Sequence, residues 1–260
     1  GILDLNGTVQ QVNILESRQS AVLARNDAHV GGGTVTNSAG TQATLAMAGS
    51  SSIFAGSIQG DIAVVRSNAA NTSNDWNLYA DQTYTGPTLY NGGRVVLNDT
   101  ASLSGTSSIE ISNATFLMTS SNNATEASNL TNRVNDAASI SLRGGMFQFR
   151  SRAALYTTET FGAVTLGEGN SIIDFAEGAT AIDQADATFL SLDRAAGSHA
   201  TVRFLNIDAT PNDDQRLFIT TLNGVLTTNI GDGLTNNLIG GWATFEREFA
   251  SYIPGQGVGG

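Results

Sequence analysis

The residues of this chain best suited to binding a metal ion are three aspartates in one acidic loop. Asp208, Asp213 and Asp214 lie in the segment Asp208–Asp214, and their carboxylate oxygens are ligands of the kind that Ca²⁺ prefers. The loop contains neither the Asp-x-Asn-x-Asn-Gly pattern of an EF-hand nor the Gly-Gly-x-Gly-x-Asp nonapeptide. We therefore interpret it as a solvated corner loop, and we predict no metal or cofactor requirement.

A second set of residues has the side chains needed for acid–base chemistry on a sugar polymer. Enzymes that cleave polysaccharides place two or three carboxylates, or a carboxylate and a basic group, on one face. The candidates are Asp174, Asp183, Asp186, Asp208 and Arg203. Asp174 and Arg203 are 29 positions apart, which would stack them if one turn of the fold had that length. An exposed ion pair is the simpler interpretation, so we predict no catalytic residue.

The two histidines give no indication of a transition-metal site. His29 and His199 each stand alone in a polar segment, with no carboxylate at ligand spacing, and the chain has no cysteine. Protein zinc sites combine three or four such ligands. A metal site at either histidine is therefore not expected.

Short paired strands must position all of these residues, and the stretch Tyr84–Asn98 shows the pattern. Thr88-Leu89-Tyr90 alternates, as a strand does. Asn91-Gly92-Gly93 then supplies the residues that a sharp corner needs, because glycine readily adopts positive φ. In the next strand, Val95 and Leu97 point to one side. Two strands joined by a Gly or Asn corner are typical of one coil of a β-solenoid.

The same strand pair returns along the chain at measurable offsets. Ile109, Ile111, Phe116 and Met118 recur 31 positions later as Ile140, Leu142, Phe147 and Phe149. Further copies follow at offsets of 21, 26 and 29: Val95 to Phe116, Phe147 to Ile173, and Ile173 to Val202. Such returns predict an all-β fold, a parallel β-helix (β-solenoid) with coils of roughly 20–30 residues and loops of varied length at the corners.

The offsets also predict which side chains are buried in stacked columns. Fifteen residues share the inward positions of the paired strands: Leu3, Leu5, Val95, Leu97, Ile109, Ile111, Phe116, Ile140, Leu142, Phe147, Phe149, Ile173, Phe175, Val202 and Phe204. Asparagines at the corners are expected to form a ladder through side-chain bonds to the next coil, namely Asn6, Asn91, Asn113, Asn170 and Asn206.

Composition excludes several classes of partner. The formal net charge is −11, and only 13% of the residues are charged. All 12 basic residues are arginines. Nucleic acids and anionic membranes require a basic face, so neither is expected as a partner. No apolar run approaches 18 residues, so membrane insertion is not expected.

Three segments resemble those of known bacterial surface proteins. Tyr84–Leu89 followed by Asn91–Leu97 resembles the autotransporter-associated β-strand repeat, with its Thr-Gly-x-Thr start and Asn-x-Gly-x-Leu-x-Leu end. Gly1–Gly7 and Ile239–Thr244 are similar to segments that recur in the same giant proteins. The resemblance implies a right-handed parallel β-helix that is exported and displayed at the bacterial cell surface, with no catalytic residues.

The sequence as a whole is interpreted as one domain spanning 1–260, with a flexible glycine-rich tail at Pro254–Gly260. The strand at Gly1–Leu5 starts a coil with no polar cap before it, and the tail is too rich in glycine to seal a core. We therefore expect a non-enzymatic structural or adhesive protein, one unit of an extracellular fibre or long stalk. Its expected partners are other copies, or flanking coils of the same protein, joined head to tail.

The alternative is a carbohydrate-binding or carbohydrate-cleaving β-helix, because this architecture also carries such activities. Surface glycans are accordingly possible partners of the chain.

Overall fold

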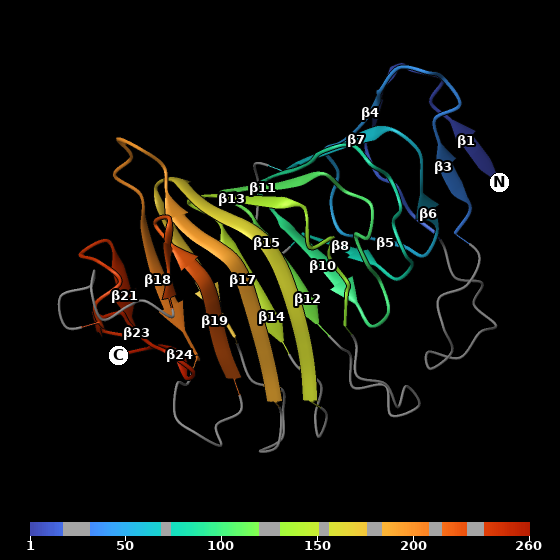
Figure 1. The fold of residues 1–260 in the computed structure, drawn as a ribbon. Helices are drawn as coiled ribbons and strands as arrows, with labels where there is room; N and C mark the ends of the chain where they lie inside the picture. The colour runs from blue at the N-terminus through green and yellow to red at the C-terminus, as the bar shows by residue number, and fades with distance from the viewer. Residues whose placement is uncertain are drawn as a thin grey trace.

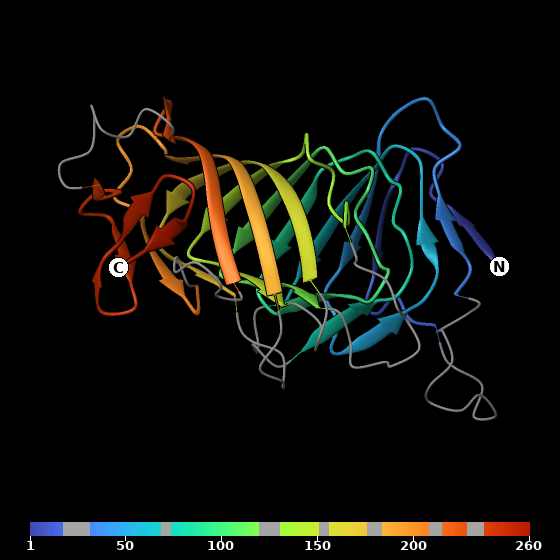
Figure 2. The ribbon, with the colours of Figure 1, turned by 60° about the horizontal axis from the view of Figure 1, so that its bottom comes forward.

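The computed structural model describes residues 1–17, 32–68, 74–119, 131–150, 156–175, 184–207, 215–227 and 237–260. The regular elements in this part of the chain, β1 to β24, are all strands. The protein is therefore all-β, as predicted. The strands lie beside one another along one axis, and the two chain ends lie at opposite ends of it (Figures 1 and 2).

Most strands belong to three sheets. The first sheet contains β1 (Ile2–Asp4), β3 (Thr34–Thr36) and β6 (Ser57–Ile58). The ten-stranded sheet contains β2 (Val9–Val12), β4 (Ala43–Met47), β7 (Ile62–Ser67), β9 (Thr88–Asn91), β11 (Ser108–Ser112), β13 (Ser139–Arg143), β15 (Tyr156–Glu168), β17 (Gln184–Arg194), β19 (Gln215–Leu222) and β20 (Val225–Leu226). The nine-stranded sheet contains β5 (Ser52–Phe54), β8 (Asp75–Leu78), β10 (Arg94–Asn98), β12 (Thr115–Thr119), β14 (Met146–Arg150), β16 (Asn170–Asp174), β18 (Thr201–Leu205), β21 (Ala243–Phe245) and β22 (Glu248–Phe249).

Strands adjacent in a sheet come from successive passages of the chain, and they run parallel. Thus β9, β11 and β13 are neighbours in one sheet, while β10, β12 and β14, which follow them in sequence, are neighbours in another. Among the described strands the antiparallel pairs are β19–β20, β21–β22 and the hairpin of β23 (Ser251–Ile253) with β24 (Gly257–Gly259), all late in the chain. This architecture is compatible with a β-solenoid.

The register confirms most of the predicted repeats. Ile109 pairs with Ile140, Phe116 with Phe147 and Val95 with Phe116, at the expected offsets. Phe147 pairs with Ile173, also as expected. The last alignment was wrong by two residues, because Ile173 pairs with Phe204 and not with Val202. A slip of two positions leaves every side chain on the same face, so alternation alone does not exclude it.

The corner between the ten-stranded and nine-stranded sheets uses residues that tolerate positive φ. Asn113 (φ 47°) joins β11 to β12, Gly144 (φ 69°) joins β13 to β14, and Gly169 (φ 72°) joins β15 to β16. The predicted ladder of corner asparagines is not continuous, because two of its five members lie in strands. Asn91 lies in β9 opposite Ser112, and Asn170 lies in β16 opposite Thr201. Asn6, Asn113 and Asn206 do adopt positive φ, as a corner requires, whereas glycines take the positive-φ positions next to Asn91 and Asn170.

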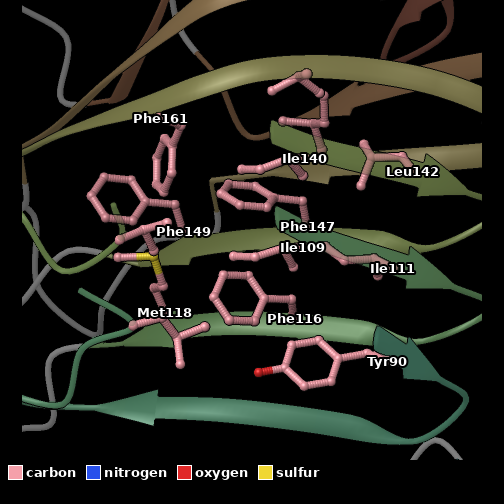
Figure 3. Packing of buried hydrophobic residues seen from close by; sticks show 14 of the residues in the cluster. Tyr90, Ile109, Ile111, Phe116, Met118, Ile140, Leu142, Phe147, Phe149 and Phe161 are labelled. Carbon is pink, nitrogen blue, oxygen red and sulfur yellow. The ribbon is translucent and has the colours of Figure 1, made fainter. Parts of the chain in front are cut away.

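Apolar side chains from the sheets fill the interior as continuous columns. Tyr90, Phe116 and Phe147 follow one another from coil to coil, with ring centroids 5.8 Å apart in each step (Figure 3). Phe161 packs edge-on against Phe147 at 4.9 Å. Of the fifteen residues predicted to be buried, fourteen are. The exception is Leu3, which is 42% exposed because β1 is the outermost strand of its sheet.

The glycine-rich tail differs from the flexible segment expected from the sequence. It supplies the turn and the second strand of the hairpin of β23 and β24, in which Tyr252 pairs with Val258. Val258 is fully buried and Tyr252 nearly so, and the Tyr252 hydroxyl accepts a hydrogen bond from the Ile219 amide at 3.3 Å. Gly257 approaches the Leu217 carbonyl so closely that a Cβ there would lie 2.5 Å from it. Glycine at position 257, which has no side chain, thus allows the tail to pack against β19.

Candidate functional site

The predicted calcium ligands fall outside the structural description. Asp208, Asp213 and Asp214, together with the catalytic candidate Asp183, lie in segments that the structure does not describe. Within the described residues, no group of three or more His, Asp or Glu side chains is placed to hold a metal ion. The described part also contains no helix with the length and apolarity needed to span a bilayer.

Asp174 and Arg203, the pair suggested by spacing, do not meet. The side chain of Asp174 accepts hydrogen bonds from Gln148 Nε2 and Asn206 Nδ2, each at 2.6 Å. Arg203 instead lies opposite Ile172, and its Nη2 is 3.8 Å from Glu246 Oε2. The two-residue shift in register accounts for the difference, because it moves Arg203 away from Asp174 along the strand.

Asp186 is the one described catalytic candidate with a basic partner. Arg216 binds it in a bidentate manner, with Nε 2.9 Å from Oδ1 and Nη2 on Oδ2. The Tyr156 hydroxyl also donates to Oδ2, at 2.6 Å. Burial, followed by this bond to the carboxylate, raises the pKa of Tyr156. An aspartate with its oxygens already engaged is suited to holding neighbouring strands together, not to exchanging protons with a substrate.

A shallow groove of about 220 Å³ lies beside this pair. It is lined mainly by hydroxyl, carboxyl and aromatic side chains: Thr131, Asn132, Tyr156, Thr158, Glu159, Thr160, Asp186, Thr188 and Phe218. The exposed ring of Tyr156 and the half-buried ring of Phe218 stand on the strands β15 and β19. Such a lining could contact a hydroxylated ligand such as a sugar.

Glu159 in this groove is a buried carboxylate that the sequence reasoning missed. It is only 4% exposed, and its Oε1 accepts hydrogen bonds from the backbone amides of Arg133 (2.8 Å) and Val134 (3.0 Å). Burial raises its pKa to about 7, against the opposing effect of these bonds and of the Arg133 charge. Its inward place in the alternation between Thr157 and Phe161 was a signal that it would be buried.

The N-terminal end of the molecule presents two outermost strands with exposed apolar side chains. β1 and β2 are terminal strands of their sheets. Ile2 on β1 is 79% exposed and Val9 on β2 is 72% exposed. A hollow of about 250 Å³ opens beside β1, with Leu3, Leu15 and Phe54 among its lining residues. Unpaired strand edges with apolar side chains are sites where another strand can add.

The C-terminal end combines a covered centre with two outermost strands. The hairpin of β23 and β24 packs against β19, while β20 and β22 are terminal strands of the ten-stranded and nine-stranded sheets. Val225 and Leu226 on β20, and Phe249 on β22, are about half exposed. Each end of the molecule therefore carries apolar side chains on terminal strands, and these two ends are the candidate functional surfaces.

Comparisons of the chain with protein-family models, with characterised proteins and with solved structures gave no match.

Proposed function

We propose that this protein is a non-enzymatic structural or adhesive protein of the bacterial cell surface, one unit of an extracellular fibre or long stalk. In this proposal the chain is a right-handed parallel β-helix with coils of roughly 20–30 residues, and its units join head to tail. The observation that carries the proposal is the exposed apolar side chains on terminal strands at both ends, represented by Val9 and Leu226.

The physical support is the contrast between the ends and the rest of the molecule. Between the ends, the strands from β4 to β19 of the ten-stranded sheet are paired on both sides, and the columns between the sheets are apolar and closed, as at Phe116. At the ends the columns stop, and the backbone groups on the outer side of β2 have no described strand to bond to. Association end to end would satisfy those groups and bury the apolar side chains.

Display outside the cell is supported by the resemblance of Tyr84–Leu97 to the autotransporter-associated repeat. The partner at an end is either another copy or flanking coils of the same protein. Both sources offer the same chemistry, namely strands with alternating apolar residues.

Light scattering followed by electron microscopy of the purified chain tests the proposal. We expect the mean mass to rise with concentration and elongated particles to appear. A monomer that persists at high concentration, with no elongated particles, would overturn assembly from copies and leave flanking coils as the occupants of the ends.

A second candidate function, binding of a surface glycan, is favoured by the groove beside Tyr156 and Phe218. A glycan array probed with the wild-type protein and with Tyr156→Ala tests it. Binding that Tyr156→Ala abolishes would support the groove, whereas equal binding by the two proteins would exclude it. Leu190→Ala, an exposed substitution on the neighbouring strand β17, is the matched control.

A further inference from the structure

We infer that the ten-stranded sheet continues from one molecule into the next through an antiparallel pair of β20 and β2, with Leu226 opposite Val9 of the next copy. The inference rests on the end-to-end association proposed above, and it specifies which strands meet, in which direction and in which register. These two strands are the two terminal strands of one sheet, so the contact extends an existing ladder.

The backbone of β2 determines which of its groups face outward. β2 runs parallel to β4, with Val9 opposite Thr44, and the Thr44 amide donates to the Thr8 carbonyl at 3.0 Å. In a parallel pair only alternate residues of a strand bond to a given neighbour. Thr8, Gln10 and Val12 therefore bond toward β4. The N–H and C=O groups of Val9 and Gln11 point to the other side, where the described residues provide no strand.

The backbone of β20 has matching groups. β19 and β20 form a hairpin in which Leu222 pairs with Val225 across Asn223 and Gly224, whose φ angles are 48° and 77°. Positive φ at both central residues is the signature of a type I′ turn, whose flanking residues bond to each other. Val225 is thus bonded to β19. The N–H and C=O groups of Leu226 point away from β19, so they can form the two bonds of one pair with Val9.

The side chains agree with the same register. Residues opposite each other share a face of the sheet. Leu226 lies opposite Thr221, an outward residue, and Val9 lies opposite the outward Thr44. Leu226 is 49% exposed and Val9 72% exposed, so pairing them covers two apolar side chains on the outer face.

The adjacent pair lies on the inward face of the sheet. Val225 shares the inward face of the buried Leu222, and Gln10 shares that of the buried Leu45. Placing Leu226 opposite Val9 in an antiparallel pair sets Val225 opposite Gln10. Both therefore share the inward face of this sheet, beside the centre that the β23–β24 hairpin covers.

A head-to-tail contact fits the rest of the end surface better than a contact between two like ends. Translation along the axis keeps the ten-stranded and nine-stranded sheets of one copy above the corresponding sheets of the other. A two-fold axis through the ten-stranded sheet would instead exchange the other two sheets, and place β1 with its exposed Ile2 against the nine-stranded sheet of the partner.

Disulfide trapping tests the pairing directly, because the chain has no cysteine of its own. Val9→Cys and Leu226→Cys are made separately, and the two proteins are mixed under mild oxidation. A bonded antiparallel pair separates Cα atoms by about 5.5 Å, within the range that a disulfide spans. Leu190→Cys, on the outer face of β17 away from the ends of the sheet, is the matched control.

We expect the Val9→Cys/Leu226→Cys disulfide to form roughly tenfold or more faster than a disulfide of either variant with Leu190→Cys, because association holds the two thiols together. Val9→Glu or Leu226→Lys alone should reduce association, and a chain carrying both should regain it. Predominant Val9→Cys homodimers, or no preference over the control, would overturn the pairing.

Light scattering of the wild-type protein at the same concentration separates the two levels of failure. Association without the preferred disulfide overturns the β20–β2 pairing and leaves end-to-end assembly standing. No association at all overturns both.

Discussion

At the residue scale, the interior shows how this chain accommodates polar groups inside stacked apolar columns. Tyr84 donates to or accepts from Thr88 at 2.5 Å, and Thr88 is linked to Thr106 at 2.8 Å. Arg133 is buried as well, and its Nε and Nη2 bond to the carbonyls of Ala101 and Leu97. Burial lowers the pKa of this guanidinium to about 10. The forked guanidinium of arginine is suited to this role, because it can donate to two carbonyls of the neighbouring coil at once.

Glu159 leads to a prediction about pH. Its folded-state pKa of about 7 is above the ordinary value of 4.5, so its contribution to stability is complete below pH 4.5 and is lost as pH rises through 7. The charged groups that act on it are Arg133 and Asp136. We expect the stability of the wild-type protein relative to Glu159→Gln to fall by roughly 3 kcal/mol between pH 4 and pH 8.

Urea unfolding at a series of pH values measures this difference. Glu168→Gln, which removes an exposed carboxylate on the same strand, is the control and should run parallel to the wild type. Parallel curves for Glu159→Gln as well would contradict a raised pKa at Glu159.

Phe147 gives the expected cost of a hole in the aromatic column. It is 1% exposed, and its ring contacts those of Phe116, Phe161 and Phe189. Phe147→Ala should lower the free energy of unfolding by about 3–5 kcal/mol, from lost burial and the cavity left behind. Phe147→Leu should cost clearly less. Equal stability of Phe147→Ala and the wild type in urea unfolding would show that the column is not packed at this level.

At the element scale, the spacing between coils depends on glycines that lie directly against the backbone of the previous coil. A Cβ on Gly86 would lie 2.2 Å from the Ile62 carbonyl oxygen, and one on Gly162 would lie 2.2 Å from that of Ala138. Gly105 similarly abuts the Thr83 carbonyl. The backbone does not yield as a flexible side chain would, so a single methyl group must separate two paired strands.

Gly86→Ala should therefore destabilise the protein, by about 1–3 kcal/mol or more, because overpacking against backbone shifts the coil. Gly40→Ala is the matched control, since nothing lies within 4 Å of a Cβ there. Melting temperatures of the two variants provide the comparison. A Gly86→Ala protein as stable as Gly40→Ala would mean that the coils are more loosely stacked than the structure shows.

The C-terminal hairpin provides a second prediction at this scale. Val258 is fully buried against β19 through a segment composed largely of glycine. Val258→Asp should lower the melting temperature by several degrees, because it places a carboxylate in an apolar site. Gly255→Asp, at a turn position with nothing within 4 Å of a Cβ, is a control for added charge, although its positive φ adds a small cost of its own. An unchanged melting temperature for Val258→Asp would contradict the packed hairpin and support the flexible tail expected from the sequence.

At the scale of the whole molecule, stability arises from contacts repeated along one axis. The parallel pairs run from β2 through to β19 with one continuous cluster of buried side chains between the sheets. In such an arrangement each coil contacts mainly its neighbours, and the ends are the exposed surfaces. The proposed end-to-end association would extend these repeated contacts from one copy to the next.

Metal removal is the prediction that belongs to this scale. We expect the melting temperature to be the same in EDTA and in millimolar CaCl₂, because repeated apolar burial accounts for the fold in the described residues. A loss of many degrees in EDTA would instead assign Ca²⁺ to the acidic segment Asp208–Asp214.

The sequence by itself determined the fold class and much of the packing. Alternation assigned each side chain to a face, and equal offsets between strand pairs specified the partners of Val95, Phe116 and Phe147. These are local properties, since a period of two follows from the geometry of any strand.

The tertiary structure decided what alternation leaves open. It shifted Val202 and Phe204 by two residues, because a slip of two preserves the buried face and the loops absorb the difference. It exposed Leu3 despite its inward position, because burial there requires a strand beyond β1. It brought to the buried Glu159 the backbone amides of Arg133 and Val134, which donate to its carboxylate and lie 26 and 25 residues away in the sequence. The match between Val9 and Leu226 likewise depends on which backbone groups the neighbouring strands leave unbonded, and that is decided only when the sheets assemble.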